Sequence, residues 1–294
     1  MCSCVGGTFA GSFKQANIVP VRILKNSNTA PFLDDIVNAI AWVINDKANS
    51  KVGAGVMSMS FGFPISALKV ANSQEVNTVD PFADIFDRIG PAGIVAVASA
   101  GNDADDDMFN RTPRRNGGRD TPMIVVGAAD ITSQKCDFSS FKDSTQNGIL
   151  SIYAVGKDVV CGGRKAFDNY ARNTGSSPAT AQVAGIVAMY LAKQQTTVAN
   201  AKAYLLSEAV RLKGANWPND GAGGQPGPGP PRAGVGYQIP CTGGGQTATQ
   251  PSYEEPDRDL FAELIREEEI SEYNDPDFDV SYLSPIFDDT EYPC

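Results

Sequence analysis

Short apolar segments alternate with amphipathic segments over the first 213 residues of the chain. The apolar segments predict strands at residues 18–24, 56–60, 94–98 and 123–126. Between them, apolar residues recur at helical spacing, which predicts helices over about 32–47 and 81–89. Strands that alternate with helices in this way indicate βαβ units. We therefore expect an α/β fold with a mainly parallel sheet flanked by helices on both faces.

Two further helices are predicted near the end of this region. Residues 179–192 (ATAQVAGIVAMYLA) are rich in alanine and apolar on nearly every side, so we expect a helix buried inside the domain. The segment is too short to span a membrane. A second helix is predicted over about 198–211, because basic residues stand in what would be its last turn, just before Gly214.

The composition changes after residue 213. Residues 214–252 are rich in glycine and proline and cannot bury enough apolar surface to offset the loss of chain entropy, so we expect a linker. Residues 253–294 are expected to form a disordered acidic tail. Residues 254–294 hold 15 acidic and two basic side chains, whereas the other residues hold 22 basic and 19 acidic ones. The net charge of −10 therefore comes from the tail, and the body is close to neutral.

Composition also excludes several functional classes. No window approaches about 18 consecutive apolar residues, so no membrane span is predicted, and no cluster of lysine and arginine suggests a nucleic-acid surface. The first residues show neither the basic start nor the long apolar stretch of a signal peptide. Six scattered cysteines and no histidine argue against a zinc site. One or two disulfides are possible, and the sequence leaves their pairing open.

Two short motifs have alternative interpretations. The acidic residues between Asp103 and Asp107 could bind calcium through hard oxygen ligands, but a solvated acidic loop is the favoured interpretation. Apart from calcium, no cofactor is predicted. Asn110-Arg111-Thr112 is a sequence for N-linked glycosylation if the protein is secreted.

The segment Gly175-Ser-Ser-Pro-Ala-Thr-Ala-Gln-Val-Ala-Gly185 contains the clearest candidate chemistry. It places a serine where the long buried helix begins, at a terminus that has unpaired N–H groups and a partial positive charge. A serine there can attack a carbonyl carbon while its own N–H stabilises the resulting oxyanion. The alternative is that Ser176 or Ser177 merely caps the helix, because serine is a favoured N-cap residue.

This segment resembles the nucleophile motif of the subtilisin-like serine proteases (subtilases), Gly-Thr-Ser-Met-Ala-Thr-Pro-His-Val-Ala-Gly. Seven of the eleven positions match in register, and the four departures are Ser176, Pro178, Ala181 and Gln182. The resemblance implies that Ser177 is the nucleophile of a serine endopeptidase that works through an acyl-enzyme.

Further segments resemble the same family in the same order, namely residues 57–62, 98–102, 137–141 and 153–156. The resemblance implies that Asn102 and the Ser177 N–H stabilise the oxyanion. It also implies a substrate cleft for a peptide or protein, lined by Ser60, Phe61, Gly62, Ala100 and Gly101. For the full-length parent it implies an extracellular location.

The chain departs from the family in one decisive respect, because it contains no histidine. Residues 16–24 match the family strand that follows soon after the histidine-bearing helix. We therefore expect residues 1–213 to be a partial subtilisin-like domain, incomplete at its N-terminus, with both the Asp and the His of the triad upstream. Serine without a base is a poor nucleophile, so the chain alone is expected to be inactive. The alternative is a non-catalytic relative that binds peptides or a partner through the cleft or the tail.

Overall fold

The computed structural model describes residues 1–23, 33–49, 53–65, 82–104, 106–163, 170–211 and 231–232. All of these residues belong to one compact unit. The acidic tail and most of the predicted linker lie outside the described residues, so the domain boundary at residue 213 remains a prediction. None of the described helices is long and apolar enough to span a membrane.

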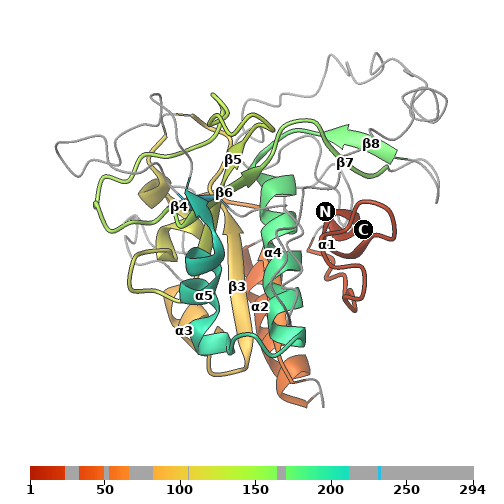
Figure 1. The fold of residues 1–294 in the computed structure, drawn as a ribbon. Coiled ribbons are helices and arrows are strands. Elements are labelled where there is room, and N and C mark those ends of the chain that lie inside the picture. Colours follow the sequence, from red (N-terminus) through yellow and green to blue (C-terminus); the bar gives the residue numbers. More distant parts are fainter. Residues whose placement is uncertain are drawn as a thin grey trace, which may run out of the picture. The chain divides into compact units, whose positions relative to one another are not determined.

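A six-stranded sheet forms the centre of the unit, with the strand order β1-β3-β5-β6-β10-β9 (Figure 1). The first five strands are parallel, and β9 is antiparallel to β10. The strands are β1 (Gly55–Met59), β3 (Ile94–Ser99), β5 (Ile124–Ala129), β6 (Ile152–Val155), β10 (Pro231–Arg232) and β9 (Val210–Arg211). The strands predicted near residues 56–60, 94–98 and 123–126 are therefore present.

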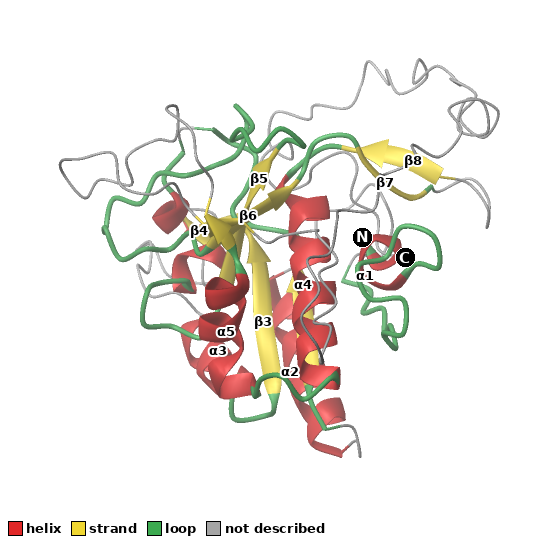
Figure 2. Cartoon of the chain, in the orientation of Figure 1, coloured by secondary structure: helices red, strands yellow, loops and turns green. Residues whose placement is uncertain are grey.

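Helices cover both faces of the sheet (Figure 2). Alternation along β3 shows how the faces are filled: Ile94, Ala96 and Ala98 pack in the core cluster that includes α2 and α3, whereas Val95 and Val97 pack against α4 and α5. The helices are α2 (Leu33–Asn49), α3 (Ala83–Ile89), α4 (Ser176–Ala192) and α5 (Ala201–Glu208), the last preceded by a 3₁₀ turn, η4 (Val198–Asn200). The predicted α/β class, with a parallel sheet flanked by helices, is confirmed.

The remaining elements are short. A hairpin of β7 (Val159–Gly162) and β8 (Tyr170–Asn173) contacts the N-terminal helix α1 (Cys2–Gly6). A buried disulfide joins Cys4 to Cys161, and Gly162 N donates to Ser3 Oγ at 2.7 Å. Beside the sheet, β2 (Phe63–Pro64) pairs with β4 (Arg111–Thr112), and β4 is flanked by the 3₁₀ turns η2 (Met108–Asn110) and η3 (Arg114–Asn116).

The predicted strand at residues 18–24 is wrong over its described part. Residues 18–23 form no regular element, and Val19 is 57% exposed. A strand needs a neighbouring backbone to accept and donate its ladder hydrogen bonds. Among the described residues β1 is the last strand at its edge of the sheet, and residues 18–23 have no strand beside them. Their apolar pattern alone does not supply those hydrogen bonds.

The helix predicted over residues 198–211 ends early. α5 stops at Glu208, Ala209 is extended with φ −71° and ψ 136°, and Val210–Arg211 forms β9. Pairing with β10 explains the change, because tertiary hydrogen bonds override a weak local preference for helix. Pro231–Arg232 lies inside the predicted linker and forms β10, which pairs with β6 on one side and with β9 on the other.

Candidate active site

The N-terminus of α4 lies at the end of the sheet where the parallel strands terminate (Figure 1). Residues Gly175–Pro178 contribute its first four positions, whose N–H groups cannot bond within the helix. The Gly175 N–H donates to Gly156 O at 2.7 Å, and the Ser176 N–H donates to Asn102 Oδ1 at 2.7 Å. The fourth residue, Pro178, has no N–H. Among these four residues, only Ser177 has an N–H without an acceptor in the described part of the chain.

Asn102 is brought directly against this turn from the end of β3. Because the Ser176 N–H can only donate, the atom of Asn102 that faces it must be the carbonyl oxygen Oδ1. This hydrogen bond fixes the orientation of the side-chain amide, and the other branch of that amide, Nδ2, is a donor. The structure therefore joins the segment carrying Asn102 to the residue immediately before Ser177.

Ser176 contributes a second contact to the same segment, because Gly101 N donates to Ser176 Oγ at 3.1 Å. Thr180 Oγ1 donates to Ser176 O at 2.8 Å, one turn further along the helix. Ser176 and Ser177 are both buried, with 1% and 2% of their surfaces exposed. The helix start and the loop after β3 are thus held by a reciprocal pair of hydrogen bonds on Ser176.

The segment after β1 also contacts the start of this helix. Ser60 Oγ donates to Ser177 O at 3.4 Å. The Phe61 ring packs against Phe63, with a centroid separation of 5.7 Å. A Cβ at Gly62 would meet Thr112 O at 3.7 Å, which is ordinary van der Waals contact. Of these three predicted cleft residues, Ser60 contacts Ser177 directly, and Phe61 and Gly62 follow it in the chain.

The other two predicted cleft residues support the site from within. Ala100 is completely buried; its N–H donates to Val126 O, and its carbonyl accepts from Arg114 Nη1 at 2.5 Å. Gly101 has φ +98°, and a Cβ there would overlap Arg114 Nη1. Glycine is required here for both reasons. Ala100 has no exposed surface with which to line a cleft, so the structure corrects that part of the prediction.

The acidic loop after Asn102 is built into an ion-pair cluster. Arg114 is 2% exposed and pairs with Asp103 at 3.3 Å and Asp106 at 3.0 Å, while Arg111 pairs with Asp106 at 2.9 Å. The interpretation of a merely solvated loop is therefore wrong for Asp103 and Asp106. In the described residues no group of three or more acidic, cysteine or histidine side chains is arranged to hold a metal ion.

Arg114 is the residue that inspection of the sequence missed. Burial lowers the pKa of its guanidinium, and the carboxylates of Asp103 and Asp106 oppose that shift. A buried cation is stable only when it is paired and hydrogen-bonded, as Arg114 is. Its bond to Ala100 O fixes the backbone just before Gly101 and Asn102. The available signal was four acidic residues between positions 103 and 107, followed within eight positions by three arginines.

Two further segments position the loop and the helix. Ser140 N donates to Gly101 O at 3.0 Å, and Asp103 N donates to Ser140 Oγ at 3.1 Å, so the loop after β3 is bonded on two sides. A Cβ at Gly156 would overlap Gly175 O, which requires glycine where β6 meets α4.

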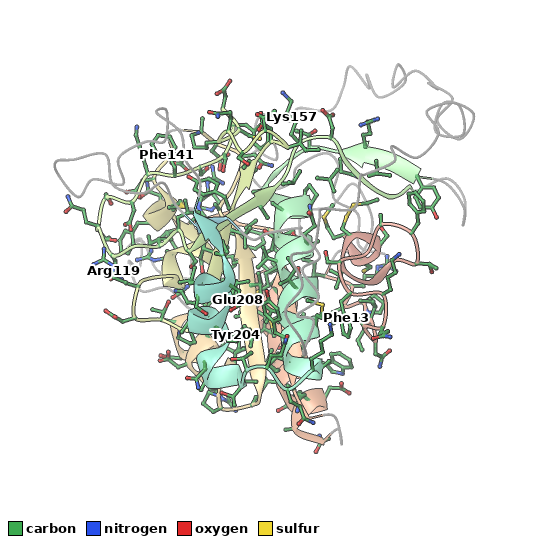
Figure 3. All side chains as sticks on the ribbon, viewed as in Figure 1. Phe13, Arg119, Phe141, Lys157, Tyr204 and Glu208 are labelled. Atoms are coloured by element: carbon green, nitrogen blue, oxygen red, sulfur yellow. A yellow bond between two sulfur atoms is a disulfide. The ribbon has the colours of Figure 1, made fainter. Side chains whose placement is uncertain are left out.

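Phe141 and Lys157 lie at this end of the sheet, whereas Tyr204 lies lower, on α5 (Figure 3).

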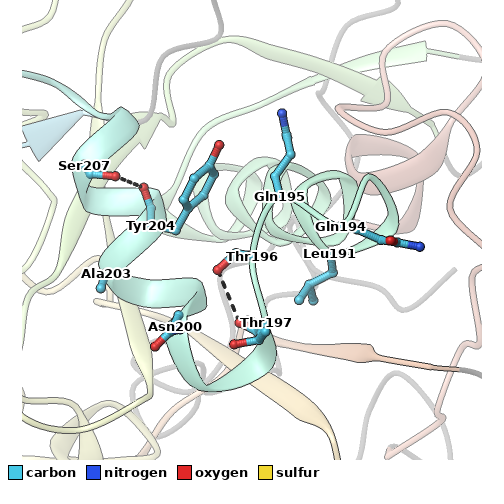
Figure 4. Close-up of a pocket in the computed structure, with 9 residues that line it drawn as sticks. All are labelled: Leu191, Gln194, Gln195, Thr196, Thr197, Asn200, Ala203, Tyr204 and Ser207. Atoms are coloured by element: carbon cyan, nitrogen blue, oxygen red, sulfur yellow. Dashed lines mark hydrogen bonds between the residues drawn. The ribbon is translucent and has the colours of Figure 1, made fainter.

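A shallow groove of about 670 Å³ lies elsewhere, between the end of α4 and α5 (Figure 4). Its lining includes Leu191, Gln195, Thr196 and Tyr204, and none of the predicted site residues. The groove and the serine site therefore use opposite ends of α4.

Comparison with known proteins assigns this arrangement to a family. The profile of the Subtilase family matches residues 2–228. The chain belongs to the subtilase family. Its family relationship establishes a subtilisin-like serine protease domain, and the segments that meet around Ser177 are the ones whose resemblance to the family is visible in the sequence.

Individual relatives agree with this assignment. The domain is 26% identical over 189 residues to an alkaline extracellular protease of Yarrowia lipolytica, covering 64% of this chain and 38% of the relative. It is 30% identical over 193 residues to a subtilisin-like protease of Coccidioides posadasii, covering 63% of this chain and 41% of the relative. The chain thus spans about two fifths of the length of these relatives.

A solved structure supports the fold. A cold-adapted subtilisin-like serine proteinase superposes with a TM-score of 0.57 at 24% sequence identity, covering 73% of this chain and 68% of that protein. The likeness extends over most of the described residues and confirms a subtilisin-like α/β architecture.

Proposed function

We propose that this subtilase domain carries the nucleophile and the oxyanion donors of a serine endopeptidase. Ser177 would attack the carbonyl carbon of a scissile peptide bond. The Ser177 N–H and the Asn102 amide would stabilise the oxyanion. The observation that carries the proposal is that, among the first four residues of α4, only Ser177 has an N–H with no acceptor in the described residues. This N–H lies next to the hydroxyl that would create the negative charge. In subtilisin, losing one such donor costs about 10²–10³ in rate.

The reaction also needs a proton acceptor. As the Ser177 oxygen bonds to the carbonyl carbon, its proton must leave, and the usual acceptor is an imidazole. No histidine occurs in the 294 residues, so these residues alone are proposed to be inactive as a protease. Oxyanion donors and binding without the triad supply about 10³–10⁴ over the uncatalysed reaction, which is negligible for proteolysis. The chemistry requires no cofactor.

The substrate is proposed to be a peptide or protein segment in an extended conformation. Ser60 contacts Ser177 O, and Gly101 and Asn102 are bonded to Ser176, the residue before Ser177. An extended peptide could bond to backbone at residues 60–62, and Gly62 leaves room for one of its side chains.

We also propose an extracellular location for the full-length parent. The buried Cys4–Cys161 disulfide supports it, because structural disulfides are typical of oxidising compartments. The relative in Yarrowia lipolytica is itself named an extracellular protease.

The lack of histidine favours a second candidate, in which the domain binds peptides without cleaving them. A fluorophosphonate probe separates the candidates, because it reacts with an activated serine. We expect no labelling of the chain alone, and labelling after addition of imidazole as an external base. The labelling should disappear in Ser177→Ala.

The control is Ser207→Ala, which removes an exposed serine hydroxyl on α5, away from the proposed site, and keeps the proposed nucleophile. Labelling that persists in Ser177→Ala contradicts the assignment of the nucleophile. Strong labelling without imidazole contradicts the proposed inactivity. Binding of a fluorescent peptide, measured by anisotropy, with no labelling under any condition would favour the non-catalytic candidate.

A further inference from the structure

Asn110 lies in the one Asn-X-Ser/Thr sequence of the chain, Asn110-Arg111-Thr112. In the structure Asn110 is exposed and ends the turn η2. Its backbone N–H donates to Asp107 O at 3.0 Å, and no hydrogen bond of its side chain is found within the described residues. We propose that Asn110 carries an N-linked oligosaccharide.

The compartment required for this modification is indicated by an independent feature. Cys4 and Cys161 form a buried disulfide whose Cα atoms are 5.3 Å apart, and such bonds form along the secretory route. The inference therefore rests on the proposed extracellular location. It does not depend on the proposed catalytic role of Ser177.

The donor would be an oligosaccharide linked to a lipid diphosphate, transferred by an enzyme of the host membrane. The Asn110 Nδ2 nitrogen forms a bond to the anomeric carbon of the first sugar. The bond between that carbon and the diphosphate oxygen breaks, and the lipid diphosphate leaves with its electron pair. The nitrogen loses one proton to a basic group of the transferase, and no oxidation or reduction occurs.

The structure also indicates when the transfer takes place. Thr112, the third residue of the sequence, is completely buried in β4, and its hydroxyl oxygen accepts a hydrogen bond from Asn116 Nδ2 at 3.2 Å. Arg111 between them is held by Asp106. A transferase must reach the extended Asn-X-Thr segment, including the threonine hydroxyl, and the folded domain does not expose it. Transfer therefore precedes folding of this region.

Once attached, the oligosaccharide is compatible with the folded domain. The neighbouring residues Phe109 and Arg115 are engaged with each other, with the guanidinium 4.2 Å from the ring centroid. Asn110, next to Phe109 in the chain, is exposed, so a glycan on its side chain would project into solvent.

The test is to direct the full 294-residue chain into the secretory pathway of a yeast host with a cleavable leader. Secretion is thereby imposed, so a negative result bears on the site and not on the natural location. We expect slower migration that is reversed by a peptide N-glycosidase, and conversion of residue 110 to aspartate in the released peptide by mass spectrometry. Asn110→Gln should abolish the shift. Asn200→Gln, an exposed asparagine outside any such sequence, should leave it unchanged.

Timing is tested with bacterially produced, oxidised chain incubated with microsomal transferase and the lipid-linked donor. The reduced and denatured chain should be modified, and the folded chain should not. A secreted chain without glycan, or a glycan retained in Asn110→Gln, overturns the proposal. Equal modification of the folded chain overturns the proposed timing.

Discussion

Replacing Gly101 by alanine tests how the loop carrying Asn102 is held. The backbone at Gly101 has φ +98°, and an added Cβ would lie 3.1 Å from both Arg114 Cζ and Asp103 Oδ2 and would overlap Arg114 Nη1. Arg114 cannot withdraw easily, because its guanidinium is bonded to Ala100 O and paired with two carboxylates. The substitution therefore has two unfavourable consequences.

The magnitude follows from those consequences. A residue other than glycine in this region of φ costs about 1–3 kcal/mol. Forcing an extra methyl group into a packed interior costs about 1–3 kcal/mol more. We therefore expect Gly101→Ala to lower the free energy of unfolding by roughly 2–6 kcal/mol. For a domain of ordinary stability this is a large fraction of the total, about 5–15 kcal/mol.

The assay is urea unfolding followed by circular dichroism at a helical wavelength. Gly62→Ala is the matched control, because it is also a glycine-to-alanine change in a predicted cleft residue, but its Cβ would be 3.7 Å from the nearest atom, which is ordinary contact. We expect that variant to change stability by less than about 1 kcal/mol. Equal stability of the two variants would refute the account of Arg114 as a fixed support behind the loop.

Three other predictions concern the rest of the domain. The Cys4–Cys161 bond closes a sequence separation of 157 residues, so reduction, or replacement of both cysteines by alanine, should lower the free energy of unfolding by roughly 3–5 kcal/mol in a denaturant titration; an unchanged midpoint would contradict this. Burial raises the pKa of the Cys136 thiol to about 11, so it should react slowly with a thiol reagent at pH 8 and quickly in denaturant, and fast native labelling would count against its burial. Burial lowers the pKa of Lys202 to about 8, below its ordinary 10.5, so the unfolded chain binds more protons between these values and stability should rise with pH there. Comparing the pH dependence of unfolding with Lys202→Met isolates this contribution, and identical slopes would exclude it.

Local patterns predicted the elements whose stability comes from burial. α4 was predicted from its apolar composition, and it is buried from Ser176 to Val187. β3 and β5 were predicted for the same reason, since all their residues are buried. In these segments the local pattern and the tertiary environment agree.

The patterns were insufficient where a neighbour decides the structure. Residues 18–23 have the composition of a strand, but none of the described strands lies beside them. Residues 210–211 leave the predicted helix to pair with β10. Nothing in either local sequence encodes the presence or absence of a partner. Hydrogen bonding between distant segments is therefore what sequence periodicity failed to predict.

The candidate site shows a similar division. Ser177 and Asn102 could be nominated from motifs, and the structure brings their segments together. Arg114 could not, because its role depends on meeting Ala100 O behind the loop. Pro178 is a departure from the family motif whose consequence the sequence does not show. In the structure it lies in the first turn of α4, where proline removes one of the N–H donors.

Occupation of these donors also sets which anions the helix start can accept. Helix N-termini with several available N–H groups are general binding sites for phosphate and sulfate, whose oxygens each need a donor. Here hydrogen bonds to Gly156 and Asn102 use two N–H groups, and proline removes a third. The start of α4 is thus suited to a single oxygen atom, such as that of a carbonyl under attack, and poorly suited to a tetrahedral ion. Competition by phosphate in the surrounding medium would therefore be weak.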